Sequence, residues 1–317
     1  MLGLLKKDSL NTARTFHRRA NHLRQNPVPT LANSFCIDYI PKPIGSNWPH
    51  KHDLALTRRD WPHGFQSPFQ AHLGQALPMV LAVVTGASRG LGFENAKSLA
   101  SLGYDIVMIA KDPDRLSSAQ QLLQQNHPAQ SFTTYPVDLE DMRAVRNTVE
   151  LISQQHGAPE ILILAHGVMS EKMSKTLKTS DAEWRRVMAI NLDSVFTLVN
   201  GLAPAMVEAR SGRIIIYSAC LGRMSGPGNA GGLAPYRISK AGVNALVRNL
   251  AHETGLGTRG VLVDAVCPNH SRTDMGGADA PRSAEEGAAC ALWLATRVFN
   301  AGDATGVLWE DNQIVEW

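Results

Sequence analysis

From Val80 onward, short apolar runs rich in β-branched residues alternate with longer stretches of helical spacing. The apolar runs predict strands at 80–85, 105–110, 131–136, 160–165, 213–218, 260–266 and 305–309. The stretches between them predict helices at 90–102, 113–126, 140–156, 181–209, 236–254 and 283–297. Runs such as IVMIA and ILILA are apolar at every position, which indicates strands buried on both faces. Such an alternation predicts an α/β fold with a doubly wound parallel sheet.

Residues 1–78 do not share this pattern. Residues 27–78 contain eight prolines and no sustained period, so they predict an irregular segment. Residues 10–24 have helical spacing, four arginines and no acidic residue, as in an organelle transit peptide. We therefore expect 1–78 to be a basic, proline-rich extension, either disordered or used for targeting, and 79–317 to form a single domain. Met79, just before the first strand, could be the functional start.

The net charge is distributed unevenly between these two parts. Residues 1–78 carry ten lysines and arginines against four aspartates, whereas residues 79–317 carry 21 basic and 24 acidic residues. The basic balance therefore belongs to the extension, and we expect no nucleic-acid partner. No apolar run approaches the roughly 20 residues that span a bilayer, so no membrane partner is expected either. We expect a cytoplasmic protein, or a mitochondrial or other organellar one if residues 1–25 are a transit peptide.

The four cysteines show neither close pairing nor the spacing of a metal site. We therefore expect reduced thiols in a reducing compartment and no metal. A hydrophobic fraction of 44% and a charged fraction of 19% are ordinary for a soluble globular protein. Ser283 and Glu286 have the spacing of a capping box at the start of the last predicted helix.

The glycine-rich stretch TGASRGLG at 85–92 lies between the first predicted strand and the first predicted helix. Gly86 permits a tight turn there, while Gly90 and Gly92 let a pyrophosphate approach the backbone and the helix N-terminus. This placement predicts a dinucleotide site in a fold of the Rossmann type. The second predicted strand ends at Lys111, where a site for NAD usually has an acid. Lys111 and Arg89 are cations that suit a 2′-phosphate, so the expected cofactor is NADP(H).

Tyr236 and Lys240 are four residues apart in a predicted helix, so their side chains lie on one face. The lysine ammonium can favour the phenolate and lower the pKa of the tyrosine toward neutral pH. Such a phenol can donate a proton to an alkoxide or take one from an alcohol. The spacing is common by itself, and its weight comes from the dinucleotide motif upstream.

These motifs together resemble the short-chain dehydrogenase/reductase family over residues 79–317. TGASRGLG is similar to the family's glycine loop, and Val137-Asp138-Leu139 to its turn at the adenine. Asn191, the pair Tyr236 and Lys240, and the segment from Pro268 to Thr273 match its remaining motifs. The C-terminal third resembles the NADPH-dependent carbonyl reductase branch. The resemblance implies cofactor contacts from Gly86, Ser88, Arg89, Gly90, Leu91, Gly92, Lys111, Asp138, Leu139, Ala165, His166, Gly167, Tyr236, Lys240, Pro268 and Thr273.

The resemblance also implies a reaction, the NADPH-dependent reduction of a ketone or aldehyde to an alcohol. Tyr236 would be the general acid, and Lys240 would lower its pKa and hold ribose hydroxyls. Asn191 would anchor a water molecule that relays protons to Lys240. The implied partner is a small carbonyl substrate, and the chain could be a monomer or a homo-oligomer.

The chain departs from the family pattern at two loops. Leu164-Ala165-His166-Gly167 replaces the family's Asn-Asn-Ala-Gly, and we favour a structural role for His166 over a catalytic one. Asn269 replaces a glycine after Pro268, and asparagine tolerates a left-handed backbone better than most residues. His270 follows near the expected nicotinamide, where a loop histidine without catalytic function is the preferred interpretation.

A third departure affects the serine that holds the substrate carbonyl. Ala219 occupies the expected position of this serine. Ser218 is adjacent, but successive strand residues point to opposite faces, so it could serve only if the strand end is bulged or shifted. The glycine-rich loop that follows also contains Ser225. Loss of one such donor typically costs roughly 10²–10³ in rate.

Three functions therefore stay open. The first is a reductase of ketones or aldehydes, and the second is a ketoacyl reductase whose substrate is attached to a carrier. The third is an NADP(H)-binding sensor or scaffold with weak or no catalysis, which the alanine at position 219 would suit.

Overall fold

The computed structural model describes residues 80–171, 175–228, 230–300 and 302–317. The predictions made for residues 1–78 lie outside the described residues.

One eight-stranded sheet forms the centre of the domain, in the order β3-β2-β1-β4-β5-β6-β7-β8. Strands β1 to β7 pair in parallel, and β8 is antiparallel to β7. The predicted doubly wound parallel sheet is thereby confirmed. The strands are β1 Leu81–Thr85, β2 Asp105–Ala110, β3 Phe132–Pro136, β4 Ile161–Leu164, β5 Gly212–Tyr217, β6 Val261–Val266, β7 Leu308–Glu310 and β8 Gln313–Val315.

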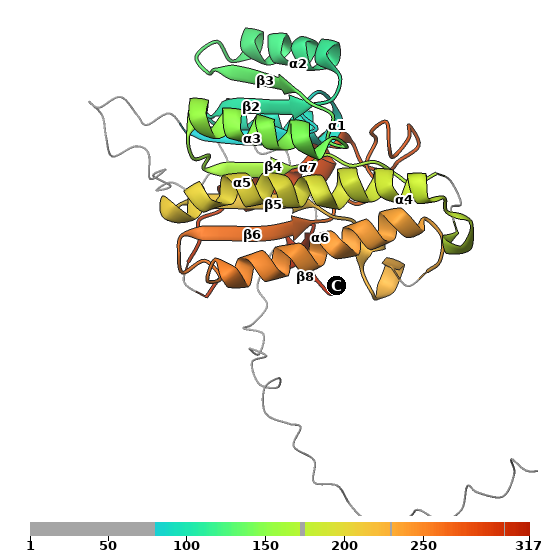
Figure 1. The fold of residues 1–317 in the computed structure, drawn as a ribbon. Helices are drawn as coiled ribbons and strands as arrows, with labels where there is room; N and C mark the ends of the chain where they lie inside the picture. Colours follow the sequence, from blue (N-terminus) through green and yellow to red (C-terminus); the bar gives the residue numbers. More distant parts are fainter. Residues whose placement is uncertain (1–79, 172–174, 229, 301) are drawn as a thin grey trace, which may run out of the picture. The chain divides into compact units, whose positions relative to one another are not determined.

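Helices cover both faces of this sheet (Figure 1). Helices α1, α2 and α7 share one buried cluster with the sheet, and α3, α5 and α6 share the other. The helices are α1 Gly90–Ser101, α2 Pro113–Asn126, α3 Met142–His156, α4 Asp181–Met188, α5 Ser194–Glu208, α6 Ala234–Glu253 and α7 Ala284–Thr296. The predicted capping box at Ser283 and Glu286 opens α7.

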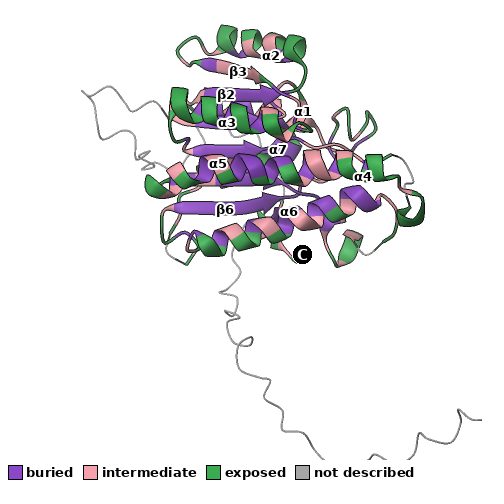
Figure 2. Ribbon diagram, in the orientation of Figure 1, coloured by how far each residue is buried: buried purple, intermediate pink, exposed green. Residues whose placement is uncertain are grey.

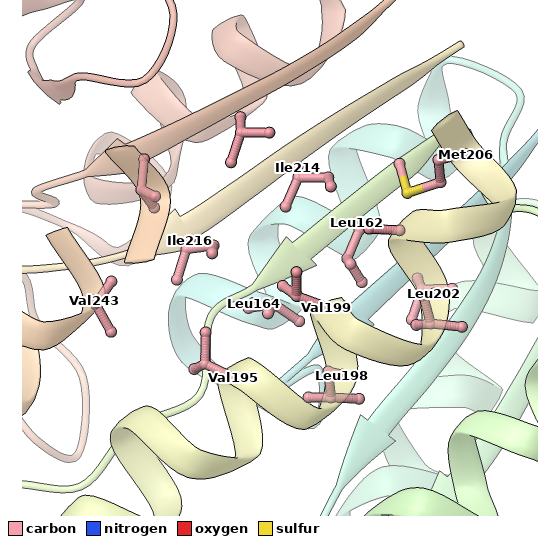
Figure 3. Close-up of a cluster of buried hydrophobic side chains, with 14 of the residues drawn as sticks. Leu162, Leu164, Val195, Leu198, Val199, Leu202, Met206, Ile214, Ile216 and Val243 are labelled. Carbon is pink, nitrogen blue, oxygen red and sulfur yellow. The ribbon is translucent and has the colours of Figure 1, made fainter. Parts of the chain in front are cut away.

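The central strands are buried along their length, as their apolar sequences predict (Figure 2). Figure 3 shows how α5 packs on the sheet, with Val199 beside Leu162 and Leu164 of β4. A helix with this many apolar positions gains stability mainly from such burial, at about 25 cal/mol per Å² of apolar surface.

The predicted helix 181–209 is not a regular α-helix. A π-helical turn, Ala189–Asp193, separates α4 from α5. The combined helix Asp181–Glu208 is, by length and composition, long and apolar enough to cross a membrane, and half of its most apolar window is buried in the domain. Burial of that extent is typical of a core helix, and the absence of a membrane partner stays a prediction.

The order of the strands creates a site for a ligand. The chain leaves β1 toward β2 on one side, and β4 pairs with β1 on the other. Ligands of open α/β sheets bind in the crevice at the carboxyl ends of the strands where the order reverses. The glycine loop follows β1 and residues 165–167 follow β4, so both segments meet at this point.

Candidate active site

The glycine loop turns tightly between β1 and α1. Gly90 has φ +57°, and a Cβ there would lie 3.2 Å from Cγ2 of Thr273. A Cβ at Gly92 would lie 2.4 Å from the carbonyl oxygen of Gly86, so a side chain has no room. Arg89, the N-cap of α1, makes no side-chain hydrogen bond to the first turn. The first N–H groups of α1 are thus left without a side-chain cap from Arg89, which suits an anion such as a phosphate.

Cationic side chains lie beside this loop and the end of β2. Arg89 forms an ion pair with Asp274, and Nη1 of Arg115 is 3.6 Å from the same carboxylate. Nζ of Lys111 is 2.6 Å from Oδ2 of Asp138. Arg115, in the first turn of α2, was not among the predicted site residues, because its direction depends on how α2 packs.

His166 connects three elements through hydrogen bonds inside the domain. Ser194 Oγ donates to Ile190 O at 2.7 Å, so it accepts from Nε2 of His166 at 2.8 Å. The other ring nitrogen, Nδ1, then accepts from Oγ1 of Thr85 at 2.6 Å. Thr85 Oγ1 also accepts from the amide of Ala165. This buried chain supports the structural interpretation of His166.

His166 is also neutral, because burial and the charge of Lys240 lower its pKa to about 3. In the unfolded chain its pKa returns to about 6.5. Below that pH the unfolded chain binds a proton that the folded chain does not bind until about pH 3. As the pH falls from about 6.5 toward about 3, the free energy of unfolding therefore decreases. This residue contributes about 1.4 kcal/mol of that decrease for each pH unit.

We expect the His166→Gln variant to lose that part of the pH dependence. Urea unfolding of the parent and the variant, at about pH 6.5 and about pH 4.5, measures the difference between their slopes. His252→Gln, at an exposed position, is the control and should keep the parent slope. An equal loss of stability in parent and His166→Gln would contradict a buried neutral imidazole.

Asn191 lies in the π-helical turn and is fully buried. Its Oδ1 accepts from Val168 N at 2.8 Å, and its Nδ2 donates to Val168 O at 2.9 Å and to Ser239 Oγ at 3.1 Å. The amide thereby ties the segment after β4 to α6. Single π turns occur frequently at functional sites, and this one holds Asn191 between the two segments that the site needs.

Tyr236 and Lys240 lie in the first half of α6, and both are buried. Ser170 Oγ accepts from the amide of Tyr236 at 2.9 Å, so a residue after β4 caps the first turn of α6. Nζ of Lys240 lies 6.0 Å from the centre of the Tyr236 ring. A Cβ at Gly167 would lie 3.5 Å from that Nζ. The structure thus brings Tyr236, Lys240, Asn191 and Gly167 together, and the roles that the resemblance implies for them stay predictions.

The expected effect of Lys240 on Tyr236 is not observed. Burial raises the pKa of Tyr236, and the nearby thiols of Cys267 and Cys220 raise it further. Nζ of Lys240 donates instead to the carbonyl oxygen of Tyr217 at 2.7 Å, and burial lowers its own pKa to about 8. The predicted lowering of the tyrosine pKa is therefore wrong for this structure, in which the ammonium bonds Tyr217 O and no hydrogen bond to the phenol is found among the described residues.

Ser218 does not reach the site. Its Oγ donates to the carbonyl oxygen of Lys240 at 3.3 Å and also bonds Oδ1 of Asn244. The amide of Ser218 continues the ladder to Val266, so the strand end is neither bulged nor shifted. The prediction of Ser218 as a catalytic residue is therefore not supported, and Ala219 keeps the position that alternation gives it. Ser225 Oγ donates to Trp317 O at 3.4 Å.

The segment after β6 forms a loop over the glycine-rich turn. Asn269 has φ +56°, the left-handed conformation that was expected of it. Nε2 of His270 bonds the carbonyl oxygen of Gly276 at 2.8 Å, and the residue is exposed. Both observations fit a loop histidine. Thr273 Oγ1 accepts from Gly276 N, so the loop that approaches Gly90 is held by its own hydrogen bonds.

A family model described as short chain dehydrogenase matches residues 80–283. The 3-oxoacyl-[acyl-carrier-protein] reductase FabG of Escherichia coli is 32% identical over 195 residues, which are 62% of this chain and 75% of that protein. The enzyme of the same name from Pseudomonas aeruginosa is 33% identical over 195 residues, again 75% of its length.

Solved structures with a similar fold include short-chain oxidoreductases. A metagenomic short-chain oxidoreductase, solved in complex with NADP, has a TM-score of 0.60 and 29% identity, covering 73% of this chain and 96% of its own. Carveol dehydrogenase from Mycobacterium avium, solved in complex with NAD, has a TM-score of 0.63 at 24% identity, covering 73% of this chain and 95% of its own. The second likeness shows the fold alone.

Proposed function

Because this chain belongs to the short-chain dehydrogenase family, we propose that it reduces a ketone or aldehyde to an alcohol with NADPH, using Tyr236 as the proton donor. The observation on which the proposal rests is the convergence of Tyr236, Lys240 and Asn191 beside Gly167, at the carboxyl ends of β1 and β4.

The residues at the crevice fit a dinucleotide. The loop leaves no room for a Cβ at Gly92, and the first turn of α1 takes no side-chain cap from Arg89. Pyrophosphates bind to helix N-termini of this kind. When bound, the nicotinamide supplies the hydride to the carbonyl carbon. Lys240 would hold the ribose hydroxyls, and the loop from Pro268 to Thr273 would hold the carboxamide.

The phenol of Tyr236 is in the protonated form that reduction needs, because burial raises its pKa. A general acid must be protonated before it acts, and this phenol is protonated at neutral pH. Lys240 keeps an ammonium with a pKa of about 8 one helical turn away. Once turned from the carbonyl of Tyr217 toward the phenol, this cation would stabilise the phenolate that remains after Tyr236 has given its proton to the alkoxide oxygen. Asn191 holds the segment after β4 against α6 while this happens.

The preference for NADPH is supported by the two guanidinium groups beside the glycine loop. Arg89 and Arg115 converge on the carboxylate of Asp274, which shows that the two side chains can hold one anion between them. A 2′-phosphate carries the same charge sign and more acceptor oxygens. Lys111, at the end of β2, adds a third cation nearby, and at this position an NAD site usually has an acid.

We expect Arg115→Ala to raise the KM for NADPH by roughly ten- to hundredfold, the loss of one charge-assisted hydrogen bond. The KM for NADH should stay unchanged, because NADH lacks the phosphate. Steady-state kinetics with both cofactors measures the difference. Arg185→Ala, which removes an exposed cation paired with Asp181 on α4, is the matched control. Equal effects of Arg115→Ala on the two cofactors would contradict a phosphate site.

Reduction of a carrier-linked 3-oxoacyl group is the second candidate, favoured by the names of the relatives from Escherichia coli and Pseudomonas aeruginosa. The two candidates separate in one assay of NADPH consumption. We expect turnover of free α-dicarbonyls, quinones or β-ketoesters. Turnover of a 3-oxoacyl group only on its carrier protein would support the second candidate. NADPH binding without turnover of any substrate would support the sensor or scaffold.

A further inference from the structure

Cys220 and Cys267 lie side by side, although they are 47 residues apart in the chain and show no pairing pattern. Strands β5 and β6 are paired up to Tyr217 and Val266, and Cys267 directly follows β6. Cys220 opens a short 3-10 turn after β5, Cys220–Gly222. Its amide donates to Sγ of Cys267 at 3.1 Å, so the two cysteines are direct neighbours in space.

The two thiols have different access and different acidity. Cys220 is half-buried, whereas Cys267 is 2% exposed. The neighbouring thiol of Cys267 lowers the pKa of Cys220, against the opposing effects of burial and of Glu310. The contact with Cys220 raises the pKa of Cys267, as does its burial. The more exposed cysteine is therefore the more acidic of the two, which is typical of oxidisable pairs.

We propose that Cys220 and Cys267 form a redox-sensitive dithiol, which a hydroperoxide oxidises to a disulfide that slows the enzyme. The Cys220 thiolate attacks a peroxide oxygen, the O–O bond breaks, and the leaving oxygen takes a proton to give water or an alcohol. Cys267 then attacks the sulfur of the resulting sulfenic acid, the S–O bond breaks, and water leaves. The two thiols lose two electrons and two protons, and the peroxide is reduced.

The disulfide would reach the catalytic residues through the turn Cys220–Gly222. Closing the S–S bond requires the two sulfurs to approach to about 2.05 Å, and the turn that carries Cys220 moves with its sulfur. A Cβ at Gly222 would lie 2.7 Å from the backbone of Lys240, and Nδ2 of Asn244 donates to Gly222 O at 3.4 Å. The turn thus packs on α6 without space to adjust. Movement there displaces Lys240 and, one helical turn away, Tyr236.

The test uses the full chain, reduced with dithiothreitol, desalted and treated with hydrogen peroxide. Remaining thiols are alkylated, and the digest is analysed by mass spectrometry. We expect a peptide pair joined through Cys220 and Cys267 that disappears after dithiothreitol. Because a shift of about 1 Å can cost 10²-fold in rate, we expect turnover to fall by roughly ten- to hundredfold and to return on reduction.

Three single cysteine variants show whether the cross-link and the loss of turnover depend on Cys220 and Cys267. Cys290→Ser, which removes a buried thiol of α7, should keep both the cross-link and the loss of turnover. Cys220→Ser and Cys267→Ser should lose both, when each oxidised variant is compared with its own reduced form. Absence of the joined peptide in the parent would overturn the proposal. So would a joined peptide with unchanged turnover and unchanged NADPH affinity.

The loss of turnover rests on the proposed reductase activity, whereas the cross-link does not. If the reduced protein consumes no NADPH with any substrate, the proposed function fails by itself. NADPH affinity, followed by the fluorescence of the bound cofactor, then replaces turnover in the comparison of oxidised and reduced protein. We expect weaker binding after oxidation, because Lys240 would hold the ribose.

Discussion

Replacing Tyr236 by phenylalanine is expected to lower kcat by roughly 10²–10⁴, the usual contribution of a positioned general acid. The change removes a single oxygen from a ring that is buried at the start of α6. The cap from Ser170 goes to the backbone amide of Tyr236 and is therefore kept. Folding and NADPH binding should stay close to those of the parent, and the loss should appear in the chemical step.

Steady-state kinetics and NADPH fluorescence titration together check this prediction. Tyr135→Phe is the matched control, because its hydroxyl contacts Gln155 and His156 on α3, and it should keep the parent kcat. Turnover by Tyr236→Phe equal to the parent would contradict the mechanism even if the protein is a reductase. A loss of NADPH affinity of the same size as the loss of kcat would point to a structural role for Tyr236 instead.

Most of the fold could be predicted because the central strands are short and apolar at nearly every position. Each predicted strand and helix from Val80 onward has a counterpart in the structure within a few residues. The exceptions have local causes. Strand β8 is three residues long, with two exposed positions in Gln313–Val315, and so has no apolar run. The π turn at Ala189–Asp193 has no signal in hydrophobic spacing, since it depends on where Asn191 finds its partners.

The candidate site could be predicted as a set of residues, and its hydrogen bonds could not. The order of the motifs predicts that Tyr236, Lys240 and Asn191 share one site. The direction of each side chain, however, depends on neighbours that are distant in the sequence. Lys240 bonds the carbonyl of Tyr217, on a different element, and so does not lower the pKa of Tyr236. The contact between Cys220 and Cys267 needs the pairing of β5 with β6.

The alanine at position 219 leads to the second large prediction. In the part of the chain that the structure describes, neither neighbouring serine replaces the missing hydroxyl. Ser218 Oγ faces the carbonyl of Lys240, and Ser225 Oγ donates to Trp317. Neither Ser218→Ala nor Ser225→Ala should therefore remove a hydrogen-bond donor to the substrate carbonyl. We expect kcat of each variant to stay within about threefold of the parent, whereas loss of a true donor costs roughly 10²–10³.

Ala219→Ser should raise kcat for a small ketone, by up to roughly 10²-fold, because it adds a hydroxyl donor where the oxyanion develops. Ala219 is 8% exposed and lies in extended backbone after the end of β5, and the variant adds one oxygen there. The gain should vanish in the double variant with Tyr236→Phe, since a polarised carbonyl still needs its proton. Parallel pH profiles separate a true rate effect from a change in the tyrosine pKa.

If Ala219→Ser leaves kcat unchanged while Tyr236→Phe abolishes turnover, carbonyl polarisation is supplied by another group. Ser170, whose hydroxyl oxygen accepts from the Tyr236 amide, would then be the residue to replace next, because its own proton has no acceptor among the contacts of the described residues.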